Sequence, residues 1–134
     1  MYIKVYILSR NMEDKIVYVI QDVPGSRIGM PKINIIGASK FGKLKILLPE
    51  NAQVTLSTSP VVAKLKSLLK DYKPTDFLLL TGDPAIIGIA CSIVSDYTNG
   101  LYKLLKWDKQ ERMYYSLEIN LNQKEENHVN DNRL

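Results

Sequence analysis

The stretch Phe77-Leu78-Leu79-Leu80-Thr81-Gly82-Asp83-Pro84 decides the fold class of this chain. The run from Phe77 to Thr81 is apolar nearly throughout and too short for most helices, which is typical of a strand buried on both faces in a parallel sheet. Asp83 suits a helix N-cap, and Pro84 suits the first helical position because its missing amide hydrogen would have no partner there. A buried strand that runs directly into a helix predicts an α/β protein.

The same signals recur on both sides of this stretch. The helix that begins at Pro84 runs to about Tyr97 and is apolar nearly all round, so it must be buried by the rest of the chain or by a partner. Upstream, Ser57-Thr58-Ser59-Pro60 opens another helix, with Ser59 as the expected N-cap, and Pro74 ends it. The apolar residues of that helix fall at helical spacing: Val61, Leu65, Leu68, Leu69 and Tyr72.

Short runs of β-branched and aromatic residues predict the other strands. They are 2–8, 15–20, 33–36, 44–48 and 53–56, followed by a closing hairpin of 101–107 and 112–121. We therefore expect one α/β domain over residues 1–121, with a mixed sheet, two crossover helices and antiparallel hairpins at its edges. Residues 122–134 are polar and rich in Asn, and we expect them to form a disordered tail.

Composition favours a soluble cytoplasmic protein. The chain has 134 residues, of which 46% are hydrophobic and 24% charged, as in ordinary globular domains. Its one cysteine, Cys91, cannot form an internal disulfide, so nothing indicates an oxidising compartment. The N-terminus lacks the pattern of a signal peptide, and no stretch is apolar enough to span a membrane.

The net charge of +4 is concentrated in one segment. Between Val23 and Pro49 there is no acidic residue, and five basic ones occur: Arg27, Lys32, Lys40, Lys43 and Lys45. In the closing hairpin, Lys103, Lys106 and Trp107 interleave positive charge with aromatic surface. Such residues can bind nucleic acid or anchor a protein contact. The alternative is a solvated lysine face on a sheet whose aromatic residues pack as cross-strand pairs.

A second candidate site lies at the two junctions of strand and helix. If the two strands are parallel, these polar residues meet at one edge of the sheet: Ser57, Thr58, Ser59, Thr81, Gly82 and Asp83. Helix N-termini attract anions, so this crevice could hold a nucleotide. Neither glycine-rich phosphate fingerprint is present, however. The alternative is that both junctions are simple helix caps.

Catalytic groups are scarce. The only histidine, His128, lies in the polar tail, and Cys91 falls inside the apolar helix. A Ser–His or Cys–His pair and a common zinc site are therefore not expected. We predict no catalytic residue and no metal site, and the sequence identifies no cofactor.

From Lys40 to Leu121 the chain resembles small uncharacterised proteins encoded by tailed bacteriophages, notably marine ones. The residues that carry the resemblance are Phe77 to Pro84, Ile89-Ala90-Cys91 and Tyr102-Lys103-Leu104-Leu105-Lys106-Trp107-Asp108. The resemblance implies a viral origin and a setting in the host cell cytoplasm, and it implies no particular reaction.

Two functions remain open. The first is a non-enzymatic phage accessory protein that binds a macromolecule, either a nucleic acid or a host or viral protein. The alternative is a nucleotide-binding α/β protein or enzyme with its site at 57–59 and 81–84. We also expect a homodimer through the hairpin edge or the apolar helix, because an exposed strand edge attracts another chain. The chain would stay monomeric if its N-terminal half covered that helix.

Overall fold

The computed structural model describes residues 14–23 and 33–124. The elements in chain order are β1 (Ile16–Gln21), α2 (Ile33–Ile36), the 3-10 turn η1 (Gly37–Lys40), β2 (Lys43–Leu48), α3 (Ser59–Leu68), β3 (Phe77–Leu79), α4 (Pro84–Thr98), β4 (Leu101–Asp108) and β5 (Met113–Asn120).

The strands form one five-stranded sheet in the order β2-β1-β3-β4-β5. The first four strands are parallel, and β5 returns antiparallel to β4. The predicted α/β fold with a mixed sheet is confirmed, and α3 and α4 are its crossover helices. The buried strand and the closing hairpin also lie where the sequence placed them.

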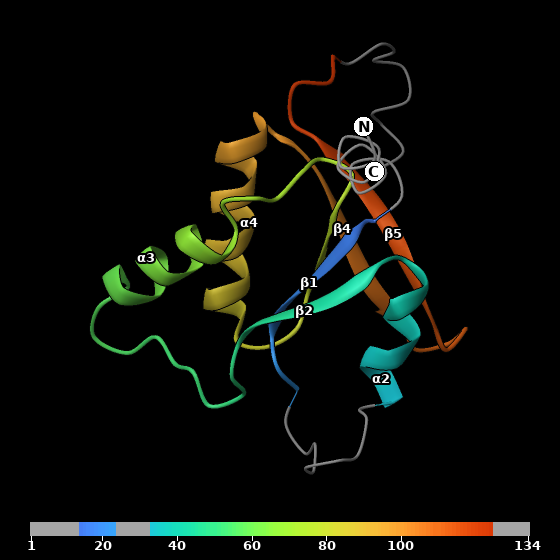
Figure 1. The fold of residues 1–134 in the computed structure, drawn as a ribbon, viewed down its shortest axis with the longest axis horizontal. Coiled ribbons are helices and arrows are strands. Elements are labelled where there is room, and N and C mark those ends of the chain that lie inside the picture. Colours follow the sequence, from blue (N-terminus) through green and yellow to red (C-terminus); the bar gives the residue numbers. More distant parts are fainter. Residues whose placement is uncertain (1–13, 24–32, 125–134) are drawn as a thin grey trace, which may run out of the picture.

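Helices cover both faces of the sheet (Figure 1). In the sheet, β2 lies on one side of β1, whereas β3 and then β4 lie on its other side, so the order in which strands are added reverses after β2. Crossovers of one hand place their helices on opposite faces when the direction reverses. Accordingly, Ile35 of α2 packs with Val17 and Val19 on one face, whereas α3 and α4 lie on the other.

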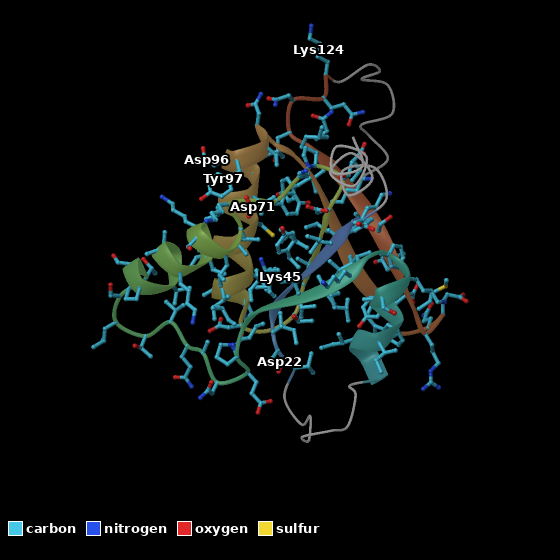
Figure 2. The ribbon with its side chains drawn as sticks, in the orientation of Figure 1. Asp22, Lys45, Asp71, Asp96, Tyr97 and Lys124 are labelled. Atoms are coloured by element: carbon cyan, nitrogen blue, oxygen red, sulfur yellow. The ribbon has the colours of Figure 1, made fainter. Side chains whose placement is uncertain are left out.

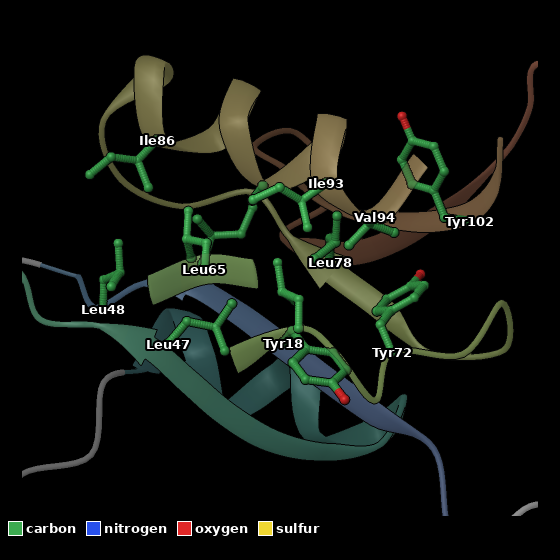
Figure 3. Close-up of a cluster of buried hydrophobic side chains, with 13 residues drawn as sticks. Tyr18, Leu47, Leu48, Leu65, Tyr72, Leu78, Ile86, Ile93, Val94 and Tyr102 are labelled. Carbon is green, nitrogen blue, oxygen red and sulfur yellow. The ribbon is translucent and has the colours of Figure 1, made fainter. Parts of the chain in front are cut away.

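The larger core lies between the sheet and the helices α3 and α4 (Figure 3). Tyr18 and Leu78 point into it from the two central strands, and Leu65 meets them from α3. The helix α4 buries four residues on its inner side: Ile86, Ala90, Ile93 and Val94. Of the two alternatives expected for the apolar helix, burial by the rest of the chain and burial by a partner, the structure shows the first for this inner side.

Two predicted strands are wrong. Residues 33–36 form α2, which continues directly into η1. Ile35 and Ala38, three positions apart, both reach the core on that face, so tertiary packing overrides the β-propensity of the run. Residues 53–56 form no strand, and Leu56 is fully exposed because no neighbouring strand pairs with this segment.

The segment 15–20, expected as a strand, forms β1, and among the described strands β1 takes part in no antiparallel hairpin. β1 lies inside the sheet, paired with β2 on one side and β3 on the other. Its two edges are therefore occupied, and within the described residues only β4 and β5 form an antiparallel hairpin. Residues 2–8 and the tail beyond residue 124 lie outside the described residues.

The helix caps are partly as expected. Asp83 is the N-cap of α4, and its carboxylate accepts a hydrogen bond of 2.8 Å from the amide of Ala85. Ser59, in contrast, is the first residue of α3, and Thr58 is the N-cap without a side-chain bond to the helix. Ser57 instead accepts a hydrogen bond of 3.3 Å from the amide of Ser59, so a local turn replaces the expected cap.

Candidate functional site

The edge of the sheet where the parallel strands end is held together by Gln21. This side chain is 3% exposed. Its Nε2 donates to the carbonyls of Pro49, Glu50 and Ala52 at 3.1, 3.2 and 2.9 Å. Its Oε1 accepts from the amide of Asp83 at 2.8 Å. One amide therefore ties the ends of β1, β2 and β3 together.

The anion-site residues at the start of α4 are engaged in this structural network. The hydroxyl of Thr81 donates to the carbonyl of Gln21 at 2.6 Å. Gly82 has a φ of +105°, and a Cβ at this position would collide with Gln21. The amides of Asp83 and Ala85 already have partners, and Pro84 has no amide hydrogen. A bound anion would have to displace these contacts.

The residues Ser57, Thr58 and Ser59 lie elsewhere. All three are exposed at the beginning of α3. Figure 1 shows α3 (green) beginning at the margin of the molecule, away from the sheet and from the first turn of α4. The structure therefore does not bring residues 57–59 close to residues 81–84, the two halves of the predicted nucleotide site. Asp83 acts as the N-cap of α4, which agrees with the alternative that this junction is a simple helix cap.

The structure places three of the five predicted basic residues between Val23 and Pro49. Arg27 and Lys32 lie outside the described residues. Lys40, Lys43 and Lys45 are exposed on η1 and β2, and the ammonium group of Lys45 lies 5.5 Å from the ring of Tyr18 (Figure 2).

On β4 the remaining predicted residues are split by the alternation of the strand. Lys103 lies over the ring of Phe77, on the face that carries α2. Trp107 shares that face, because it lies two positions beyond Leu105 of the same core. Lys106 points to the opposite face. The candidate nucleic-acid surface is thus divided between two sides of the sheet.

Groups for catalysis remain scattered in the described part of the chain. No cluster of three or more His, Cys, Asp or Glu side chains occurs there. Asp76 is fully buried and accepts hydrogen bonds from the amides of Ile16 and Lys73 at 2.9 and 3.0 Å. Asp108 accepts from the turn that follows β4. Burial raises the pKa of the Cys91 thiol, which disfavours the thiolate.

The hairpin edge, which the sequence indicates as a surface that attracts another chain, is formed by β5. It ends the sheet, and its eight residues pair with β4 without a bulge. Its sequence, MYYSLEIN, contains no Lys, Arg or Pro, and Glu118 is its only charged residue. Strand edges are usually protected by such residues or by bulges, so the outer edge of β5 is open to pairing among the described residues.

Within the described residues, the face of β5 on the side of α4 is only partly covered. Leu117 pairs with Leu104, and Ile119 pairs with Tyr102, which places these residues on the side of the larger core. In the described part of the chain α4 packs mainly over β1 and β4, and side chains at the beginning of β5 stay partly exposed. We call Met113, Tyr115 and Leu117 the β5 stripe; they are 52%, 37% and 39% exposed.

A cleft of about 520 Å³ lies at the end of this face, between α4 and the residues that follow β5. The side chain of Asn122 donates to the carbonyl of Asn99 at 2.6 Å and links the two sides. Asp96, labelled on α4 in Figure 2, lies on one wall. The full lining is Cys91, Ser92, Ser95, Asp96, Asn99, Gly100, Tyr102, Leu121 and Asn122. The cleft and the β5 stripe together give this side of the molecule a polar and an apolar part.

The alternation of residues 113–119 could have indicated this surface, since it predicts one apolar face on the hairpin. It could not indicate that α4 stops short of β5, because that depends on how the crossover helix lies across the sheet.

Comparison with known protein families gives a match over most of the chain. A family model described as Phage Pam3 gp32-like protein matches residues 15–121. The match begins well before Lys40, where the resemblance seen in the sequence began, and so includes the basic segment. Neither the curated proteins nor the solved structures gave a match. None of the helices in the described ranges is long and apolar enough to cross a membrane.

Proposed function

The chain belongs to the Phage Pam3 gp32-like protein family, and we propose that this phage accessory protein acts by binding a protein partner along β5. The observation that carries the proposal is the coincidence of two open features on one strand. Among the described residues its outer edge pairs with no further strand, and the β5 stripe exposes apolar side chains directly beside that edge.

An extended segment of a viral or host protein fits both features. It can add as a further strand, with main-chain hydrogen bonds supplying affinity and alternate side chains packing on Tyr115 and Leu117. Exposed aromatic and large apolar residues are typical anchors of protein interfaces. The host cytoplasm is the setting we propose for this contact.

A protein partner has more support than a nucleic acid. Binding to a phosphate backbone depends on several cations that track one path. Here Lys103 and Lys106 point to opposite faces of β4, and β5 carries no cation at all. Neither feature favours a continuous positive groove.

The test compares two variants that add the same charge to the same strand. Leu117→Lys places an ammonium group in the β5 stripe, whereas Ser116→Lys places it on the other face, at a position that is also exposed. Tagged wild-type protein and both variants are used to capture proteins from phage-infected host cells. We expect a partner whose capture falls at least tenfold with Leu117→Lys and is retained with Ser116→Lys.

Two further measurements separate the alternatives. Electrophoretic mobility with single- and double-stranded DNA and RNA at two salt concentrations tests nucleic acid, since phosphate contacts weaken as salt rises. Light scattering coupled to size exclusion tests whether a second copy occupies β5. Salt-dependent nucleic-acid binding that Leu117→Lys leaves intact, with no partner lost, would overturn the proposal. Self-association abolished by Leu117→Lys would replace the proposed partner by a second copy of this chain.

A further inference from the structure

A second cavity lies on the other face of the sheet, at the edge where the parallel strands end. Its volume is about 230 Å³. Leu79, Leu80, Thr81 and Gly82 line it from β3 and the turn that follows, and Trp107 and Tyr114 line it from the hairpin. Val23, just after β1, completes the lining. In open α/β sheets ligands bind at this edge, beside the point where the strand order reverses, which here lies between β1 and β3.

Aromatic rings form one wall of the cavity. The centroids of Trp107 and Tyr114 are 5.0 Å apart, and their planes meet at 65°. Tyr114 is 7% exposed, whereas Trp107 is 36% exposed. The indole of Trp107 therefore stands at the mouth of the cavity, with its partner ring deeper inside. Such a pair presents ring faces and edges to which another ring can stack or pack edge-on.

The chemistry of the lining restricts the ligand. No charged side chain is among the lining residues. In the part of the chain that the structure describes, neither the indole N–H of Trp107 nor the hydroxyl of Tyr114 has a hydrogen-bond partner, so both remain available to a ligand. The hydroxyl of Thr81 is already engaged with Gln21. The cavity is smaller than the 300 Å³ or more that is usual for drug-sized ligands.

We propose that this cavity binds a small neutral aromatic ring, held against Trp107 and Tyr114 above the apolar floor of Leu79. The ring can belong to a free heterocycle such as a nucleoside base or to an aromatic side chain of a peptide. A phosphate or carboxylate on the ligand must stay outside, because nothing in the lining neutralises it. The cavity lies on the face opposite the β5 stripe. The proposal of an aromatic ligand therefore does not depend on the proposed protein contact along β5.

The test uses the fluorescence of Trp107, which is the only tryptophan of the chain and so reports on this cavity alone. Adenosine represents the heterocycle, and N-acetylphenylalanine amide represents the side chain. N-acetylleucine amide is the aliphatic control, and adenosine monophosphate tests the effect of charge. We expect a saturable change in emission with at least one aromatic ligand, binding at least tenfold weaker for the aliphatic amide, and no gain from the phosphate.

Two variants locate the binding. Val23→Phe fills the cavity and is expected to weaken binding at least tenfold. Ile46→Phe adds the same ring at an exposed position outside the lining, and is expected to leave binding unchanged. Because Val23→Phe can also disturb folding, the amide resonances of wild-type Leu80 and Gly82 are followed during the titration. The proposal is overturned if no aromatic ligand gives a saturable change, if Val23→Phe binds like wild type, or if resonances shift only elsewhere.

Discussion

Replacing Gln21 with alanine tests whether one buried amide holds together the edge of the sheet at which the parallel strands end. The side chain meets three carbonyls with its two N–H donors and receives one hydrogen bond from the amide of Asp83. No other side chain in the described residues links the ends of β1, β2 and β3 in this way. Gln21→Ala removes all of these bonds at once and shortens a side chain that is almost completely buried.

The magnitude follows from the number of bonds and from their surroundings. Three net hydrogen bonds at about 1 kcal/mol each, and one lost methylene at about 0.8 kcal/mol, give a loss of roughly 4 kcal/mol. Water can reach the carbonyls of Pro49 and Glu50, which belong to exposed residues, and this offsets part of the loss. We therefore expect the free energy of unfolding to fall by about 2–4 kcal/mol. A domain of ordinary stability remains folded after such a loss.

Urea unfolding followed by far-ultraviolet circular dichroism measures this change. Gln53→Ala is the matched control, because Gln53 is exposed and should lose less than about 0.5 kcal/mol. Gln21→Glu keeps the shape but faces the carbonyls with oxygens, and protonation restores a donor. Its destabilisation should therefore be larger at neutral pH than at about pH 4. A loss below about 0.5 kcal/mol for Gln21→Ala would refute the assigned role.

Three further outcomes are expected. Gly82→Ala should lower the free energy of unfolding, measured in urea, by about 2 kcal/mol, because φ is +105° and the new Cβ would collide with Gln21. Gly88 in α4 has open space around it, so Gly88→Ala should raise the free energy of unfolding by about 0.5–1 kcal/mol. Equal effects of the two substitutions would contradict this reasoning. Asp83→Ala removes the cap of α4 and should cost about 1 kcal/mol in thermal unfolding, and an unchanged midpoint would argue against the cap. Burial raises the pKa of Tyr72 above its ordinary value, so the stability it contributes is present below about pH 10 and is lost as pH rises through the folded-state pKa. Urea unfolding at stepped alkaline pH should show that fall, reduced in Tyr72→Phe, and an identical fall in the variant would exclude Tyr72 as its source.

The candidate sites were only partly visible in the sequence. Trp107 was singled out as an anchor, and it does stand at a cavity mouth. Trp107 packs on Tyr114 as a cross-strand pair, which is the arrangement that the sequence analysis kept open for the hairpin aromatics, and the register of β4 and β5 fixes which rings meet. Thr81 and Asp83 were selected for their position at the end of a strand. Their side chains turned out to serve the structure, because Gln21, sixty positions before Thr81, fills the space between them.

The sequence by itself determined the elements whose signals are local. The apolar run at Phe77, the cap formed by Asp83 and Pro84, and the alternation in the closing hairpin each depend on neighbours a few residues away. These signals were enough to predict an α/β fold with a mixed sheet.

Only the tertiary structure decided what depends on distant partners. It placed β1 in the interior of the sheet, turned residues 33–36 into a helix, and set α4 mainly over β1 and β4 rather than over β5 in the described residues. Each of these outcomes follows from which strands pair and how far a crossover helix extends across them. Burial is a property of the assembled layers, and a residue such as Leu117 has the same sequence neighbours whether or not α4 reaches it.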